Sequence, residues 1–349
     1  MMIMVDTRIY KVTDLDKNDV QADIKNIVRS GKNIIFPTET VYGIGASALS
    51  EKGVQNIYKV KGRPSDNPLI MHFSDIGSIH DYIHIDQSYV KKLIEAFWPG
   101  PLTMVFRRKP VVPNTITGGL DTVAIRVPSH PIAQKVIAIA GVPVCAPSAN
   151  ISGTPSSTLF EHVYADFNKK VDIIIDGGKS DVGLESTVLD VTGDVPVILR
   201  PGIITKAMIK SITPHVDMSE ALQGTEVPKS PGMKYKHYAP SGKLTIVEGE
   251  EEKVTDYIND QIKKQHQSNK KVGVIATANL AKRFDTDYVF NIGESFDEAI
   301  IASNLYIALR TMDQMQIDVI YSVSFHQGRY GEVIMNRLYK AANHRVVKV

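Results

Sequence analysis

The chain has 349 residues, of which 40 are Lys or Arg and 38 are Asp or Glu, so its formal net charge is +2. With 43% hydrophobic and 22% charged residues, the composition is that of an ordinary globular protein and excludes a mostly disordered chain. The length predicts two domains, and the near-neutral charge excludes a basic field over the whole molecule. The single cysteine, Cys145, excludes an intramolecular disulfide and a zinc site built from cysteines, and we expect it to pack as a small apolar residue.

The sequence shows neither a signal peptide nor a stretch that could span a membrane. Residues 1–10 contain charged side chains and no apolar core, so we expect no signal peptide. The longest uncharged apolar stretch, residues 136–146, is broken by Gly141 and Pro143 and is far shorter than the ~20 residues of a membrane span. The sequence therefore predicts a soluble, cytoplasmic protein.

The first two hundred residues alternate between short β-rich runs and helical patterns. We expect strands at residues 33–36, 69–73, 102–107, 122–127, 171–175, 186–191 and 195–199. We expect helices at residues 20–28, 51–61, 88–97 and 131–140. This pattern predicts an α+β domain with a twisted mixed sheet over residues 1–210. Residues 43–48 match the dinucleotide pattern G-x-G-x-x-A, but they are separated from both strand and helix, so we expect a tight loop there.

The second half of the chain begins with a proline-rich segment, residues 211–242, which we interpret as a linker. Residues 243–349 then alternate regularly, which predicts a smaller, Rossmann-like α/β domain. Its strands are expected at residues 243–247, 271–276, 288–292 and 319–325, and its helices at 251–264, 296–316 and 332–342. Ser295 and Glu298 are spaced as a capping box for the long helix at residues 296–316.

Three cations, Lys59, Lys61 and Arg63, alternate beside a glycine and two prolines in one loop. Cations held in this way suit a polyphosphate, although composition alone is equally compatible with a solvated basic loop. Further polar stretches punctuated by Gly, Pro or Ser occur at strand ends, and they favour a binding site. They are residues 37–40, 121–128, 146–153, 183–188 and 199–202.

Two other patterns leave alternatives open. Arg126 alternates with Val123, Ile125 and Val127, so it either faces away from them or is buried with an anionic partner. The pattern alone slightly favours a surface arginine over a clamp for a substrate carboxylate. His80 and His84 are four residues apart, but a metal site needs a third ligand, so we expect a solvated pair and no metal site.

Five segments, taken together and in their order along the chain, are specific enough to indicate a protein family. They are Pro37-Thr-Glu-Thr-Val-Tyr-Gly43, Lys61-Gly-Arg-Pro with Asn67-Pro-Leu-Ile-Met-His72, Trp98-Pro-Gly-Pro-Leu-Thr103, Ala146-Pro-Ser-Ala-Asn150 and Leu199-Arg-Pro-Gly202. They closely resemble the YrdC-like domain of the L-threonylcarbamoyladenylate synthase family. The segments Pro231-Gly-Met-Lys-Tyr235-Lys-His-Tyr-Ala-Pro240 and Met335-Asn-Arg337 extend the resemblance to the long, two-domain form, so it covers essentially the whole chain.

The resemblance implies synthesis of threonylcarbamoyl-AMP from L-threonine, bicarbonate and ATP, with release of pyrophosphate. The product would pass to the machinery that forms N6-threonylcarbamoyladenosine in tRNA. By the same resemblance, threonine contacts fall at Thr40, His72, Arg126, Ala146 and Ser186. ATP contacts fall at Lys61, Arg63, Asn67, Thr122, Ser148, Ser156, Arg200 and Tyr235. Mg²⁺, held mainly by the nucleotide, would accompany ATP.

The side chains at these positions suit the reaction that the resemblance implies. The nucleophile is a carbamate anion, so no Ser, Cys or His nucleophile is required, and Lys61, Arg63 and Arg200 would oppose the charge that develops on pyrophosphate. We assign Lys61 and Arg63 as the catalytic residues, and residues 231–240 as a lid that excludes water.

Two other function classes compete. The first is a double-stranded RNA-binding or tRNA-binding module without its own catalysis. The net charge of only +2 disfavours it, and so does the lack of a basic stretch with interleaved aromatic residues. A carbamoyltransferase of the hydrogenase-maturation kind shares the YrdC-like domain. It would need paired C-x-x-C motifs, which a chain with one cysteine cannot supply.

Overall fold

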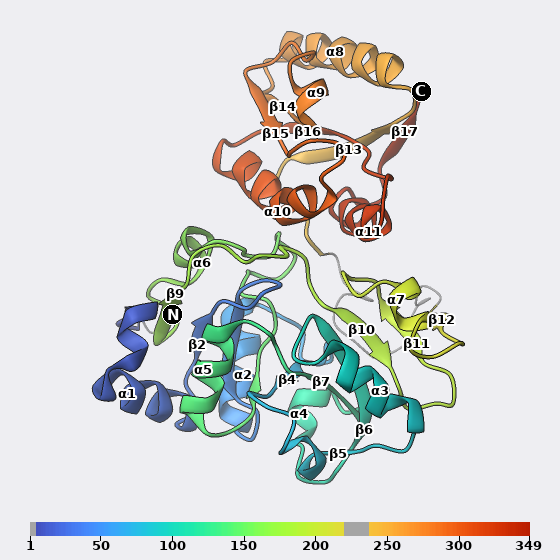
Figure 1. The fold of residues 1–349 in the computed structure, drawn as a ribbon. Coiled ribbons are helices and arrows are strands. Elements are labelled where there is room, and N and C mark those ends of the chain that lie inside the picture. Colours follow the sequence, from blue (N-terminus) through green and yellow to red (C-terminus); the bar gives the residue numbers. More distant parts are fainter. Residues whose placement is uncertain (1–4, 220–236) are drawn as a thin grey trace. The chain divides into compact units, whose positions relative to one another are not determined.

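A computed structural model describes residues 5–219 and 237–349, which fall into two compact units (Figure 1). The first unit comprises residues 5–152, 157–181 and 185–219. The second comprises residues 237–349 together with two short segments, 153–156 and 182–184. Most of the predicted linker and lid, including Tyr235, lies outside the described residues. The boundaries at residues 210 and 242 therefore stay predictions.

The first unit is built on one mixed sheet of twelve strands. Their order is β1-β9-β2-β3-β8-β4-β7-β6-β10-β11-β12, with β5 paired to β6. The strands are β1 (Arg8–Lys11), β2 (Ile34–Phe36), β3 (Gly43–Ser47), β4 (Ile70–His72), β5 (Ile83–His84), β6 (Leu102–Arg108), β7 (Thr122–Arg126), β8 (Val144–Cys145), β9 (Ile173–Asp176), β10 (Thr187–Asp190), β11 (Val197–Arg200) and β12 (Asp217–Met218). Parallel and antiparallel pairs both occur, which confirms the predicted mixed sheet.

Helices bury two apolar clusters against this sheet. Residues of α1 (Asn18–Arg29) and α5 (Pro131–Ala140) form one cluster with Ile34 and Phe36 of β2, whereas Ile35 belongs to the other cluster. Successive strand residues point to opposite faces, so the two clusters lie on opposite sides of the sheet. The second cluster takes residues from α2 (Glu51–Lys61), α3 (Ser88–Phe97), α4 (Asn114–Thr117), α6 (Phe160–Phe167) and α7 (Lys206–Lys210). Two 3₁₀ helices, η1 (Val12–Asp16) and η2 (Ile79–Asp81), complete the unit.

The ends of α2 are set by local chemistry. Ser50 caps the helix by accepting a hydrogen bond from the Gly53 amide at 3.2 Å. Gly62 follows the last turn in the left-handed conformation (φ 63°), which glycine adopts at low cost. The helix therefore stops directly after Lys61, and this stop places Lys61 and Arg63 on either side of the turn.

The prediction of a tight loop at residues 43–48 is wrong, because Gly43–Ser47 form the fully buried strand β3. A Cβ atom on Gly45 would lie 2.7 Å from a Val144 side-chain atom and 2.9 Å from one of Phe36. Glycine is thus required by close packing inside the sheet rather than by a phosphate-binding turn.

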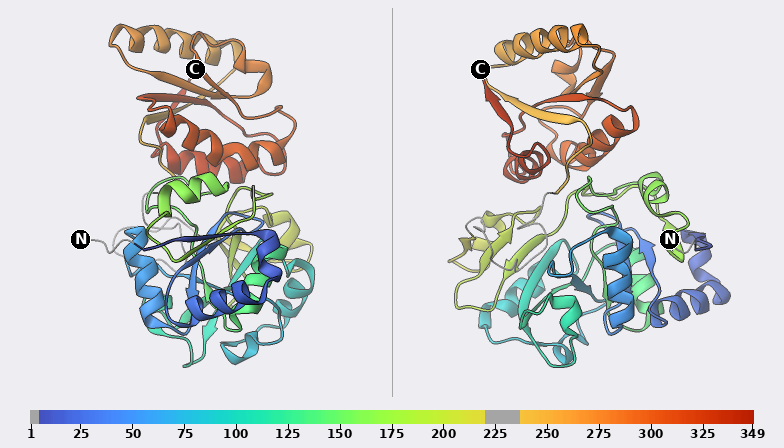
Figure 2. Two further views of the ribbon diagram at one scale, coloured as in Figure 1. Left: turned by 90° about the vertical axis from the view of Figure 1, so that its left-hand side faces the viewer. Right: turned by 180° about the vertical axis from the view of Figure 1, so that it is seen from behind.

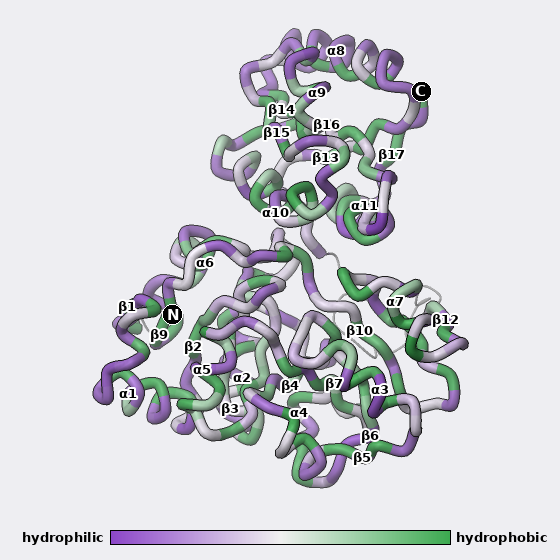
Figure 3. The backbone as a smooth tube through the Cα atoms, in the orientation of Figure 1, coloured by the Kyte–Doolittle hydropathy of each residue, from purple (hydrophilic) through white to green (hydrophobic). Residues whose placement is uncertain are grey.

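The second unit is a parallel five-stranded sheet with helices on both faces (Figure 2), which confirms the predicted α/β domain. Its strand order is β15-β14-β16-β13-β17. The elements are β13 (Lys243–Glu248), α8 (Glu251–Gln267), β14 (Val272–Ala276), α9 (Ala278–Ala281), β15 (Tyr288–Asn291), α10 (Glu298–Gln314), β16 (Val319–Val323), α11 (Gly331–Ala341) and β17 (Val346–Lys348). Figure 3 shows α8 as mainly hydrophilic, because only one stripe of this helix, which includes Val254, Ile258 and Ile262, is buried.

The predicted capping box of the long helix is wrong. The helix begins at Glu298, three residues after Ser295, and Asp297 caps it by accepting a hydrogen bond from the Ile300 amide at 3.1 Å. Glu298 instead accepts a hydrogen bond from the Tyr330 amide. α8 and α10 have 17 residues each and carry charges, and within residues 5–219 and 237–349 no helix is long and apolar enough to span a bilayer.

Candidate active site

A row of polar side chains lies on one face of the central strands of the first unit. It consists of His72, Thr103, Arg126 and Ser186. Residues two apart in a strand share a face of the sheet. Each polar residue of the row is two positions away from an apolar residue that belongs to one small buried cluster. That cluster contains Ile70, Val105, Ala124 and Val188. His72 pairs with Arg126 in the sheet register, and the Thr103 and Ser186 hydroxyl oxygens are 2.7 Å apart. Met104 pairs with Ile125 in the antiparallel β6–β7 ladder, which brings the next residues, Thr103 and Arg126, together and joins the two halves of the row.

Arg126 is 4% exposed and lies beside an anion. The surface arginine that the pattern alone slightly favoured is therefore wrong, and the alternative of burial with an anionic partner is correct. Its Nη2 atom is 2.8 Å from Glu39 Oε1. Nη1 donates to Thr40 Oγ1 at 2.8 Å, and Nε donates to the Gly100 carbonyl at 3.3 Å. Nε and Nη1 thus make hydrogen bonds to the protein, whereas Nη2 forms an ion pair with Glu39 but no hydrogen bond within the described residues, so guanidinium N–H groups remain for a ligand.

Glu39 is the functional residue that sequence reasoning missed. Its Oε1 also accepts a hydrogen bond from the Ser129 amide at 3.1 Å, whereas Oε2 is buried and has no hydrogen-bond partner among the described residues. Burial raises the pKa of Glu39, but attraction to Arg126 and its hydrogen bonds outweigh burial, so the pKa lies below its usual value of 4.5. The available signal was a lone carboxylate within an otherwise uncharged motif, residues 37–43.

We expect Glu39→Gln to lower the free energy of unfolding by ~3–5 kcal/mol at pH 7, because it leaves the buried Arg126 charge uncompensated. The pKa of Glu39 is lowered by folding, so the ion pair stabilises the protein above the unfolded pKa and this stabilisation is lost as the pH falls through the folded pKa. Urea unfolding should therefore show a constant difference from wild type above pH 5 that shrinks in acid.

Glu95→Gln is the matched control, because the Glu95 side chain is 64% exposed and lies 4.0 Å from Lys91 in a surface pair. We expect a change below ~1 kcal/mol for this variant. Equal losses in the two variants, or a Glu39→Gln difference that does not depend on pH, would contradict the structural role assigned to the ion pair.

His72 supplies a neutral imidazole next to Arg126. Burial lowers the pKa of His72 to about 3, and the nearby Arg126 charge adds to this effect, so the ring is uncharged at neutral pH. Its Nδ1 lies 3.2 Å from the Ile70 carbonyl oxygen, and a proton on Nδ1 would leave Nε2 as an acceptor. The Ala146 amide donates to the same carbonyl at 3.0 Å, which places Ala146 beside His72.

The cationic loop is anchored by backbone carbonyls. Lys61 is 2% exposed, and its Nζ donates to the carbonyls of Ser148 and Asn150, both at 2.5 Å. Arg63 is half-buried, and its Nη2 donates to Asn67 Oδ1 at 2.6 Å. The alternative of a solvated loop is therefore wrong for Lys61 and Arg63, whereas Lys59 is exposed.

One contact joins the two predicted sets of ligand residues. Arg200, from the ATP set, donates from Nε to the Ser186 carbonyl at 3.1 Å and from Nη2 to Ser186 Oγ at 3.2 Å. Ser186 belongs to the threonine set, and both residues are buried. The polar row thus continues from the Arg126 side of the sheet to a second buried guanidinium.

Three predicted ATP residues are not brought into these contacts. Thr122 begins β7 whereas Arg126 ends it, so the two are roughly 13 Å apart along the strand. Ser156 clusters with the second unit, and Tyr235 lies outside the described residues.

Three further side chains, Cys145, His80 and His84, are reactive in principle but lie outside the polar row. Cys145 is buried, and burial raises its pKa to about 12, so it packs as an uncharged apolar residue. His80 and His84 are both exposed, but they lie on η2 and β5 rather than on one helix. Among residues 5–219 and 237–349, no group of three or more His, Cys, Asp or Glu side chains could hold a metal ion.

Comparison with known proteins decides the family. Residues 26–202 match the family described as "Telomere recombination", and residues 204–343 match the family described as "Threonylcarbamoyl-AMP synthase, C-terminal domain". The threonylcarbamoyl-AMP synthase of Pyrococcus abyssi is 46% identical over 324 residues, which cover 92% of this chain and 94% of that protein. The chain belongs to the threonylcarbamoyl-AMP synthase family.

Other members of the threonylcarbamoyl-AMP synthase family are similar to this chain over nearly its whole length. The Bacillus subtilis enzyme is 44% identical and covers 97% of both chains. The crystal structure of P. abyssi Sua5 complexed with L-threonine is 42% identical, with a TM-score of 0.90 over 99% of each chain. The predicted family, fold class and enzyme class are therefore confirmed, and the activity of the chain is the synthesis of threonylcarbamoyl-AMP for tRNA modification. The alternative of an RNA-binding module without catalysis finds no support.

Proposed function

We propose that the first unit binds L-threonine with its carboxylate on Arg126. The observation that carries this proposal is the buried guanidinium, which is held by three protein oxygens and keeps N–H groups that make no hydrogen bond within the described residues. A carboxylate pairs with two such groups in a bidentate manner. The P. abyssi relative is described as complexed with L-threonine, which supports this substrate class.

The threonine hydroxyl would meet the neutral acceptors of the site. The Thr40 hydroxyl accepts a hydrogen bond from Arg126, the uncharged His72 ring belongs to the residue paired with Arg126 in the sheet, and the Ser186 hydroxyl extends the same row. Ala146 would offer backbone groups beside His72. A site that hydrogen-bonds a substrate hydroxyl rejects an analogue without it, because buried polar groups then stay unpaired. We therefore propose that the site prefers L-threonine to L-2-aminobutyrate.

ATP would lie along the cations, with its polyphosphate at Lys61, Arg63 and Arg200. The remaining contacts that we propose are Asn67, Thr122, Ser148, Ser156 and Tyr235. The threonine amine takes up bicarbonate-derived CO₂ as a carbamate, and one carbamate oxygen attacks the α-phosphorus. An O–P bond forms, the bond to the β-phosphate oxygen breaks, and pyrophosphate leaves with the electron pair. The protein's part is positioning and neutralisation of charge, since the nucleophile is already an anion.

Mg²⁺ would accompany the nucleotide rather than sit in a protein cage. The candidate ATP residues described in the structure are cations, hydroxyls and an amide, with no carboxylate among them. This donor set suits an ion held by phosphate oxygens and water. When bound, Mg²⁺ supplies additional positive charge against the phosphates. We place the reaction in the cytoplasm, with the product passed to the tRNA threonylcarbamoyl-transfer machinery.

Pyrophosphate release tests this function. With ATP, bicarbonate and L-threonine all present, we expect steady release. Omission of threonine or bicarbonate should abolish it, and replacement of L-threonine by L-2-aminobutyrate should lower it strongly. Release that continues without threonine would mean that the chain is an ATP pyrophosphatase, and the proposed substrate assignment would be wrong.

A further inference from the structure

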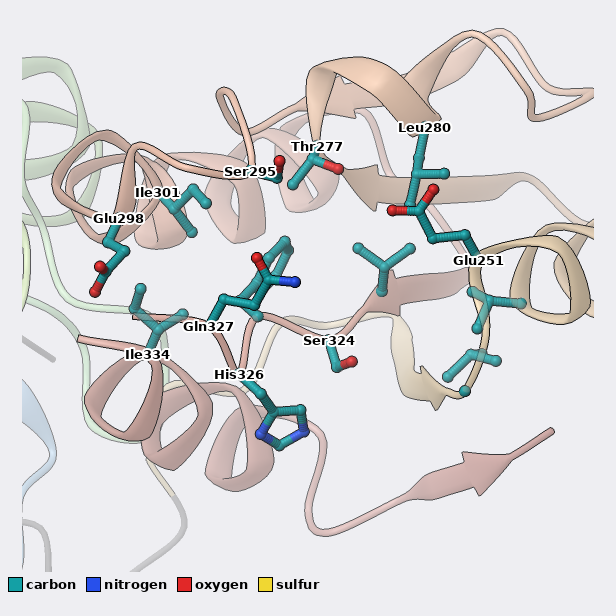
Figure 4. Close-up of a pocket in the computed structure, with 15 residues that line it drawn as sticks. Glu251, Thr277, Leu280, Ser295, Glu298, Ile301, Ser324, His326, Gln327 and Ile334 are labelled. Atoms are coloured by element: carbon teal, nitrogen blue, oxygen red, sulfur yellow. The ribbon is translucent and has the colours of Figure 1, made fainter. Parts of the chain in front are cut away.

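The second unit contains a crevice of about 190 Å³ at the carboxyl ends of its parallel strands (Figure 4). Val247 is the second-last residue of β13, Thr277 follows β14, and Val323 ends β16. The loop after β16 supplies Ser324 and Gln327. Its volume is below the roughly 300–1,000 Å³ of drug-sized pockets, so it suits a small ligand.

The topology of the sheet creates this crevice. β13 and β16 are neighbours, but β13 leads into α8 on one face of the sheet and β16 leads into α11 on the opposite face (Figure 2). The two chains therefore separate directly after the strand ends. Such a switch point, outside the carboxyl ends of parallel strands, is where open α/β sheets bind ligands.

The lining combines an apolar floor with unpaired polar groups. Val254, Leu280, Ile301 and Ile334 contribute aliphatic surface. The side chains of Ser324, which is half-buried, and of Ser295 and Gln327, which are exposed, make no hydrogen bond to any residue in the described ranges. Hydroxyl and amide groups at a cavity wall remain available to a ligand that can both donate and accept hydrogen bonds.

The charged groups that line the crevice disfavour an anionic ligand. The crevice is lined by the carboxyl side chains of Glu251 and Glu298, and by no Lys or Arg among the described residues. His326 also lines it, with its Nε2 atom 3.1 Å from Glu248 Oε1. The first turns of α8, α10 and α11 supply lining residues, and each helix N-terminus is equivalent to about half a positive charge. The two carboxylates offset these helix ends, and no Lys or Arg side chain among the described residues is present to pair with a phosphate, which disfavours a phosphate.

We propose that this crevice binds a nucleoside without phosphates. The apolar floor would receive the base, the Gln327 amide could pair with a base edge through its donor and its acceptor, and Glu251 and the hydroxyls of Thr277 and Ser324 would bind ribose hydroxyls. This binding site is separate from the polar row of the first unit and does not depend on the roles assigned there.

Isothermal titration of the full chain with adenosine, guanosine, cytidine and uridine tests the proposal. L-Threonine and a non-hydrolysable ATP analogue are kept saturating, so that the first unit is occupied. We expect at least one nucleoside to bind at one per chain, and its 5′-monophosphate to bind at least 10-fold more weakly. No binding by any of the four nucleosides, or equal affinity for the monophosphate, would overturn the proposal.

Variants locate the site. Ser324→Leu fills the cavity and should weaken nucleoside binding at least 10-fold, whereas Ser268→Leu, on an exposed residue just after the far end of α8, should leave it unchanged. Gln327→Ala removes an exposed side chain without filling the cavity, and should weaken binding about 5-fold even if Ser324→Leu folds poorly. Nucleoside binding that is equal in wild type and in both crevice variants would place the ligand elsewhere and refute the proposal.

Discussion

Replacement of Lys61 by alanine is expected to lower the turnover number for threonylcarbamoyl-AMP synthesis by about 100- to 1,000-fold, the typical cost of removing one group that stabilises developing charge. Lys61 is a buried cation at the end of α2, where the turn at Gly62 fixes its direction. Threonine binding should remain, because Lys61 Nζ donates to the carbonyls of Ser148 and Asn150, which lie on another segment than Arg126, Thr40 and His72. Steady-state kinetics with each substrate varied in turn measures both quantities.

Lys59→Ala is the matched control for this experiment. Lys59 lies two residues earlier on the same helix but is exposed, so we expect its kinetics to stay within about 3-fold of wild type. Lys61 Nζ also ties the carbonyls of Ser148 and Asn150, so threonine binding is measured without nucleotide as well. If that binding collapses in Lys61→Ala, Lys61 is a structural residue and its catalytic role is refuted. Arg63→Ala should lower turnover in the same direction.

Arg126→Ala is expected to weaken the use of threonine far more than the use of ATP. A buried, charge-assisted contact to a carboxylate is typically worth ~2–5 kcal/mol, which corresponds to roughly 30- to 5,000-fold in kcat/KM for threonine. The KM for ATP should change by less than about 3-fold, because the proposed polyphosphate contacts Lys61, Arg63 and Arg200 lie on other elements. Titration of each substrate against the variant separates the two effects.

The single substitution also leaves Glu39 buried without its partner, which itself destabilises the fold. The double variant Glu39→Ala and Arg126→Ala removes both charges, so it should recover stability without recovering threonine use. Arg283→Ala, at an exposed position in the second unit, is the control for loss of an arginine. An unchanged KM for threonine together with wild-type turnover would exclude Arg126 as the carboxylate clamp.

Local signals in the sequence were sufficient for most helices. The prediction of α2 at residues 51–61 is confirmed to the residue, because the boundaries of this helix depend on Ser50 and Gly62, its immediate neighbours. The prediction failed for β3, where glycine normally signals a loop. Gly45 is instead required by the side chains of Phe36 and Val144, and Val144 is almost one hundred residues away, so no local pattern reports it.

The candidate site was also predictable from the sequence only in part. The motifs and their resemblance to a known family identified Arg126, Thr40 and Ser186, and strand alternation limited Arg126 to two environments. Its burial depends on Glu39, which is 87 positions earlier in the chain and meets Arg126 only when β7 and the loop after β2 come together. A pairing of this kind follows from the tertiary fold, and single-sequence periodicity carries no information about it.

Synthesis of the product from labelled bicarbonate tests the central assignment most directly. The full chain is incubated with ATP, ¹³C-bicarbonate and L-threonine, and nucleotides are analysed by mass spectrometry while pyrophosphate is counted. We expect threonylcarbamoyl-AMP that carries one ¹³C atom, formed in equal amount to pyrophosphate, and greatly reduced in Arg126→Ala. Formation of ADP and phosphate instead, or pyrophosphate without labelled threonylcarbamoyl-AMP, would contradict attack of a threonine carbamate on the α-phosphorus.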